Sequence, residues 1–154
     1  MSCNLVIAGP SIDSIFAAIK KAIREEARTS ATQLAMDQRK NVAQRTARGI
    51  GEFDGTMLTL SDPYARRKAK LGKQSFRDLR LSGDMIRDMQ ANGATKTGEA
   101  WLSTVTFKTA RSQLIAQYNQ RRSPWFGVSP NDKTKLMRWM NDNFGARLAK
   151  RIGK

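Results

Sequence analysis

Residues 11–48 form one uninterrupted pattern that dictates the shape of the fold. Apolar side chains recur in it at the 3.6-residue spacing of an amphipathic helix, and no glycine or proline breaks the run before Gly49. Ser11 is a suitable N-cap for this helix. At about 1.5 Å per residue the helix would be about 57 Å long, which exceeds the width expected of a domain of 154 residues. The helix must therefore either kink or project towards another molecule.

The apolar stripe of this predicted helix is uneven. Large apolar residues are frequent up to Ile23, whereas alanine, threonine and glutamine dominate afterwards. We expect the first half of the helix to pack in the core, and the second half to form an interface or to fray. The heptad seam of a coiled coil is not sustained, which argues against that architecture.

An aromatic turn, residues 122–128, leads into the last predicted helix. Ser129 is an N-cap candidate, a proline follows at the first helical position, and Asp132 stands where it would complete a capping box. Trp125 and Phe126 are thereby held just before a rigid helix start. Their rings could fill the local core or could anchor the chain on a neighbouring subunit, and the two interpretations are compatible.

The remaining segments predict a small antiparallel sheet with helices against one face. Alternating apolar residues and a Thr-Gly turn predict a hairpin over residues 94–108, and residues 3–8 predict a further short strand. Apolar spacing predicts short helices over residues 84–90 and 110–118 and a final helix over residues 130–150. The inward side chains of the last two helices are expected to be Leu114, Ile115, Tyr118, Leu136, Met140, Phe144 and Leu148. The predicted fold is α+β, a single domain in which a small antiparallel sheet is packed by the long N-terminal helix and by the C-terminal helix.

A glycine-containing loop over residues 49–80 carries the densest positive charge of the chain. The chain has 28 Lys and Arg against 13 Asp and Glu, a formal net charge of +15. This excess predicts attraction to polyanions, whether nucleic acid, an acidic protein surface or anionic lipid. The loop is either a flexible solvated segment or a contact that becomes ordered on a phosphate or an acidic partner. The contact candidates in it are Arg66, Arg67, Lys68, Lys70 and Lys73.

Residues that commonly carry catalysis are scarce. The absence of histidine removes the most frequent general base and most zinc sites. Cys3 is the single cysteine, so it has no partner for an internal disulfide, and it is compatible with a reducing cytosol. Asp54, Asp62 and Asp84 could converge on a metal ion in a nuclease, although each also fits a turn or a helix start. We expect no catalytic site, cofactor, metal, signal peptide or membrane span.

Three segments follow one another in a recognisable order. They are residues 53–68, which contain FDG and LTLSDPYARRK, residues 79–86, LRLSGDMI, and residues 122–132, RSPWFGVSPND. In order and spacing this set resembles the tail-completion (virion morphogenesis) proteins of tailed bacteriophages, over roughly residues 10–150.

The resemblance implies a structural virion protein, made in the cytoplasm of the bacterial host and placed at the head–tail junction as a tail-completion, tail-terminator or neck component. Proteins of this kind form homo-oligomeric rings, commonly hexamers, that join the tail tube protein to a neck or head-completion protein without catalysis and without a membrane. The basic loop, Trp125 and Phe126 are then interface or polyanion-contact candidates, with the genomic DNA in the channel as a further contact. Two alternatives remain from the residues alone: a basic nucleic-acid-binding module and a small metal-dependent nuclease.

Overall fold

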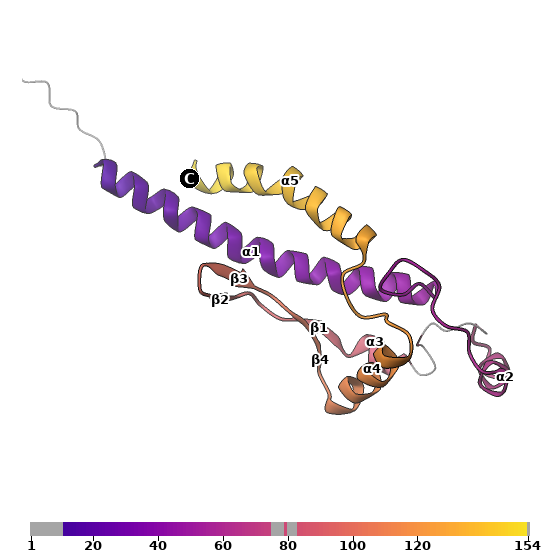
Figure 1. Cartoon of the computed structure of the whole chain (residues 1–154). Coiled ribbons are helices and arrows are strands. Elements are labelled where there is room, and N and C mark those ends of the chain that lie inside the picture. Colours follow the sequence, from indigo (N-terminus) through magenta and orange to yellow (C-terminus); the bar gives the residue numbers. More distant parts are fainter. Residues whose placement is uncertain (1–10, 75–78, 80–82, 154) are drawn as a thin grey trace, which may run out of the picture.

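The computed structural model describes residues 11–74, 79 and 83–153, and its architecture is α+β as predicted (Figure 1). A long N-terminal helix runs along most of the molecule, with the C-terminal helix along one side and a twisted β-ribbon along another. The elements are α1 (Ile12–Ala47), α2 (Asp62–Lys70), α3 (Asp84–Arg87), β1 (Met89–Ala91), β2 (Thr95–Thr97), β3 (Ala100–Leu102), β4 (Val105–Phe107), α4 (Ala110–Arg122) and α5 (Pro130–Ile152). The strand predicted over residues 3–8 lies outside the described residues.

The two halves of α1 have the opposite roles from those predicted. The second half carries most of the buried residues, among them Ala35 and Val42, and α5 packs antiparallel along it. The first turns extend past the end of α5, so Ile12 is 72% exposed and Phe16 is 57% exposed. The prediction was wrong because small side chains, which make a weak apolar stripe, allow two helices to approach closely.

The ribbon contains the predicted hairpin, but the strand predicted over residues 100–108 is divided in two. β2 pairs antiparallel with β3, and β4 pairs antiparallel with β1. The register places Ala91 opposite Val105 and Thr95 opposite Leu102. Between the two ladders the first arm has three residues, 92–94, and the second arm has two, 103–104, as at a β-bulge. The extra residue changes which side chains of that arm lie on each face of the ribbon.

The core lies where the ribbon, α4 and the second half of α1 meet. Its buried apolar residues are Val42, Met57, Met85, Ile86, Met89, Ala116 and Trp125. Met89 was predicted to lie in the helix over residues 84–90, but α3 ends at Arg87 and Met89 begins β1. On α4 the small residues Ser112 and Ala116 face inward.

The predicted inward residues of the last two helices divide into two outcomes. Leu114, Ile115 and Tyr118 are exposed, so that prediction was wrong. The inner face of α4 packs against Trp125 through the small residue Ala116, whose carbonyl oxygen accepts a hydrogen bond from the indole N–H at 3.4 Å. The four residues predicted for α5 are half-buried along the face that meets α1: Leu136, Met140, Phe144 and Leu148.

The segment predicted as a basic loop contains the nine-residue helix α2, which begins at Asp62 and includes a proline in its first turn. Before it, the chain makes a tight turn against the aromatic turn. Gly51 is required there because a Cβ at this position would lie 2.6 Å from the carbonyl oxygen of Pro124. The neighbouring Glu52 N–H donates to that same oxygen at 2.9 Å.

Candidate functional site

The N-terminus of α5 is fixed by the capping box that the sequence predicts. Ser129 Oγ accepts a hydrogen bond from the Asp132 N–H at 3.1 Å, and the Asp132 carboxylate accepts one from the Ser129 N–H at 3.4 Å. Asp54, from the preceding tight turn, accepts a further bond from the Asn131 N–H at 2.9 Å. That bond is the main reason why the pKa of Asp54 is lowered. The role of Asp54 in the structure is therefore to accept a hydrogen bond at the N-terminus of α5, not to contribute to a metal site.

Arg45, near the end of α1, joins this helix start to the aromatic turn. Its guanidinium forms a buried ion pair with Asp132 and donates to the carbonyl oxygens of Trp125 at 2.7 Å and Gly127 at 2.8 Å. Gln38, two turns earlier, donates to Gly127 at 2.7 Å and to Asp132 at 3.3 Å. Two segments distant in sequence, the end of α1 and residues 125–132, are thereby held together by one cation.

The aromatic turn fills the core of its own chain. Trp125 is 0% exposed and packs against Phe107 and Phe126, with ring centroids 6.3 Å and 5.4 Å away. The core interpretation is confirmed for Trp125, and a ring buried in this way cannot serve as an interface candidate. Phe126 packs against the core cluster but is only half-buried, so part of its ring is accessible at the surface and it stays an interface candidate.

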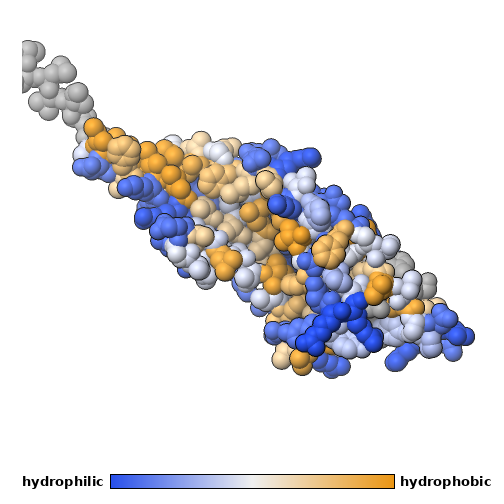
Figure 2. Space-filling model, viewed as in Figure 1, coloured by the Kyte–Doolittle hydropathy of each residue, from blue (hydrophilic) through white to orange (hydrophobic). Residues whose placement is uncertain are grey.

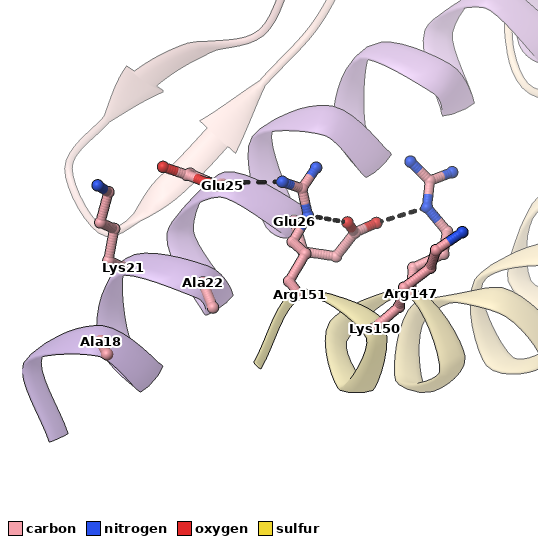
Figure 3. A pocket seen from close by; sticks show the side chains of 8 residues that line it. All are labelled: Ala18, Lys21, Ala22, Glu25, Glu26, Arg147, Lys150 and Arg151. Atoms are coloured by element: carbon pink, nitrogen blue, oxygen red, sulfur yellow. Dashed lines mark hydrogen bonds and ion pairs between the residues drawn. The ribbon is translucent and has the colours of Figure 1, made fainter. Parts of the chain in front are cut away.

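A second ionic cluster joins α1 to the end of α5 (Figure 3). Glu26, 1% exposed, forms an ion pair with Arg147, whose Nε is 2.8 Å away, and accepts a hydrogen bond from Arg151 Nε at 2.6 Å. Ser30 adds a bond at 2.9 Å. Burial tends to raise the pKa of Glu26, but the hydrogen bonds from Arg151 and Ser30 and the two nearby cations outweigh it and lower the pKa. The pocket at this place, about 620 Å³, is lined by a satisfied ion cluster.

We expect Glu26→Gln to lower the free energy of unfolding by about 1–2 kcal/mol, since a charged acceptor of several hydrogen bonds is lost. The folded pKa lies below the ordinary value of 4.5, so this contribution is complete above that pH and is lost as the pH falls through the folded pKa. Urea unfolding of both proteins at pH 7 and pH 3 measures it. Glu25→Gln, at an exposed carboxylate on the same helix, is the control and should change stability little. An equal deficit at both pH values would contradict the assignment.

The overhanging end of α1 is an apolar surface. Figure 2 shows an apolar band along this end of the molecule. Its exposed members are Ile12, Ile15, Phe16 and Ile23. Exposed apolar patches of this kind are sites of interaction with other proteins, membranes or ligands.

The exposed cations of α2 form a separate basic surface. Arg66, Arg67 and Lys70 are exposed on this helix, and Lys73 is exposed just after it. Lys68 is 1% exposed, so it does not belong to this surface and its place among the contact candidates was wrong. The reason is the helical period, which the loop prediction ignored: position 68 faces inward while its neighbours face solvent.

The carboxylates that the sequence offers for a metal site do not come together in the described part of the chain. No group of three or more acidic or cysteine side chains within residues 11–74, 79 and 83–153 could hold a metal ion. Asp62 lies in the first turn of α2, and Asp84 in the first turn of α3 next to Arg87. The three carboxylates considered for a nuclease are thus each placed at a different helix start.

No helix within the described part of the chain is long and apolar enough to cross a bilayer.

Sequence reasoning missed Arg45, Gln38 and Glu26. The available signal was position: Glu26 lies on the same helical face as Ala22 and Ser30, and Gln38 and Arg45 lie on the same face as Ala35 and Val42. A polar side chain among small residues on a packed face must be paired, although the sequence does not say with what.

Comparison of the chain with protein-family models, curated proteins and solved structures gives no match.

Proposed function

We propose that the chain is a structural subunit of a tailed-phage virion, which assembles into a ring at the head–tail junction and joins the tail tube to the neck or head connector. The observation that carries this proposal is the apolar end of α1, which extends beyond the rest of the fold with four large apolar side chains exposed. The resemblance of residues 53–68, 79–86 and 122–132 to tail-completion proteins supplies the virion context.

A ring is the assembly that this shape supports. The apolar end is at one extremity of an elongated molecule, and in a ring a neighbour would meet it with a different surface of its own. Such heterologous contacts close into a ring when the rotation between copies permits. Between Ile12 and Ile23 this end carries only Asp13, Lys20 and Lys21 as charged residues, a net charge of +1, so it adds little repulsion between copies of a chain whose net charge is +15.

The direct test is solution mass together with electron microscopy of the purified chain, alone and mixed with tail tubes. We expect rings that sit on tube ends. A chain that stays monomeric and does not bind tail tubes at any concentration would contradict the proposal.

Phe16→Glu should weaken self-association at least about tenfold, which corresponds to about 1.4 kcal/mol, because a charge replaces a ring at the centre of the apolar end. Sedimentation at a series of concentrations measures it. Tyr118→Glu, at another exposed aromatic residue on α4, is the matched control. The unfolding free energy of Phe16→Glu should stay near that of the parent, because Phe16 is exposed within its own chain. If both variants weaken self-association equally, the apolar end is not part of the interface.

The basic surface of α2 supports a second candidate function, contact with nucleic acid. Three exposed cations on one short helix are a source of salt-dependent phosphate contacts. In a ring this surface would meet the DNA in the channel or an acidic partner ring.

Reversing Arg66, Arg67 and Lys70 to glutamate should reduce DNA affinity more than tenfold and lower the magnitude of the salt slope by about 2–3. Fluorescence anisotropy with duplex DNA across a salt series measures both. Reversing the exposed Lys133, Lys135 and Arg138 on α5 gives the same change in net charge and serves as control. If the two triple variants lose affinity equally, binding follows net charge and α2 is no specific contact.

A further inference from the structure

A groove on the outer side of β4 is the starting point. It has a volume of about 480 Å³ and lies between β4 and α4, with Phe126 contributing to its wall. Its lining is uncharged except for Arg121: Val105, Thr106, Phe107, Gln113, Ala116, Gln117, Gln120, Arg121 and Phe126.

The hydrogen-bond pattern of the β1–β4 ladder shows which backbone groups face away from β1. Lys108 N–H donates to Asp88 C=O at 3.0 Å, and Asn92 N–H donates to Thr104 C=O at 2.8 Å. In an antiparallel pair, hydrogen-bonded and non-hydrogen-bonded positions alternate. The middle residue of β4 is therefore bonded to β1, and its two neighbours direct their N–H and C=O groups outward.

Those two neighbours are Val105 and Phe107. No turn, cap or side chain of the described residues bonds to their outward backbone groups. Both residues line the groove. An open strand edge beside an apolar groove is the geometry that accepts an added strand from another chain.

The chain itself has a segment suited to this edge. Residues 3–8 read Cys-Asn-Leu-Val-Ile-Ala, a sequence with strand propensity that ends at Gly9-Pro10. Residues 1–10 contain no charged side chain, so their docking on another copy adds no repulsion in a protein of net charge +15. Leu5 and Ile7 share one face of such a strand and match the apolar side of the groove.

The length of α1 prevents this segment from reaching the groove of its own chain. The groove lies at the level of Val42, which belongs to the same core cluster as Ala116 and packs with Val105 and Phe107. From Ile12 to Val42 the helix covers about 45 Å at about 1.5 Å per residue. The chain from Cys3 to Ile12, even fully extended, covers at most about 32 Å. A partner groove must therefore belong to a second copy.

We propose that residues 3–8 of one copy add as a strand to the outer edge of β4 in the next copy, with Leu5 and Ile7 in the groove beside Phe126. The exchange is directional, since each copy gives a strand at one place and receives one at another, so it leads to a ring or an open filament. It deepens the proposed ring by naming one lateral contact, and it rests on the self-association proposed above.

The single native cysteine allows a direct test. In Gln117→Cys, at an exposed position on the groove wall, mild oxidation should join Cys3 of one copy to the new thiol of the next. We expect a ladder of disulfide-linked multimers on a non-reducing gel. The ladder should be absent in Gln117→Cys combined with Cys3→Ser, and at least about fivefold weaker in Asn141→Cys, an exposed position on α5. Equal ladders for both positions, no ladder, or a disulfide within one chain would overturn the proposal.

A proline scan supplies the second measurement. Val6→Pro removes a backbone donor from the middle of the added strand and should weaken self-association at least about tenfold. Ser2→Pro, outside the strand, should leave self-association unchanged, and an unchanged association in Val6→Pro would count against the exchange.

Electron microscopy separates the strand exchange from the proposed ring function. Rings in a protein that gives no disulfide ladder would support the ring function and contradict the strand exchange. A disulfide ladder in a protein that forms no rings and does not bind tubes would support the strand exchange and contradict the ring function.

Discussion

Replacing Arg45 by methionine is expected to lower the free energy of unfolding by about 3–5 kcal/mol, because it leaves the buried carboxylate of Asp132 without its cation. The loss extends further, since the carbonyl oxygens of Trp125 and Gly127 also lose the guanidinium that donates to them. Methionine keeps the length and apolar stem of the side chain, so the change tests the charge and its hydrogen bonds more than the volume. Urea unfolding followed by circular dichroism measures it.

A same-helix control and a double-mutant cycle separate the ion pair from general effects. Arg39→Met, at an exposed position of α1, should change stability by less than about 0.5 kcal/mol. Asp132→Asn combined with Arg45→Met should be less destabilised than the sum of the two single changes, since the pair is lost once. Additive effects, or an Arg45→Met protein as stable as Arg39→Met, would show that the pair does not hold the aromatic turn.

Replacing Trp125 by alanine should cost about 3–5 kcal/mol of stability, the range for removing a large aromatic side chain from a core. The ring is fully buried and touches two phenylalanine rings, so the cavity it leaves lies at the junction of the ribbon, α4 and the aromatic turn. Thermal and urea unfolding at a concentration where the chain is monomeric measure this effect free of association.

Trp101→Ala is the matched control, because Trp101 is only half-buried on β3 and should cost less than about half as much. The comparison also tests the core position of Trp125 that the structure shows. A Trp125→Ala chain that keeps its monomer stability would contradict that position. Loss of stability in the monomer would agree with the core position.

Local chemistry explains which predictions hold. The capping box at Ser129 and Asp132, the hairpin turn before β3 and the start of α1 at Ser11 are each determined by residues a few positions apart, and the structure confirms them. The face that a helix buries is decided by distant residues. That is why Leu114 and Tyr118 face solvent and why the alanine-rich half of α1 is the packed half.

By itself, the sequence determined the α+β class, the long first helix, the terminal helix with its cap and the lack of histidine chemistry, because propensity, capping and composition act locally. Only the tertiary structure decided that Arg45 meets Asp132, that Lys68 is buried and that the apolar end of α1 is left exposed. The physical reason is that burial and ion pairing depend on which segments meet in space. Residues 45 and 132 are 87 positions apart, and no pattern along the chain specifies that they come together.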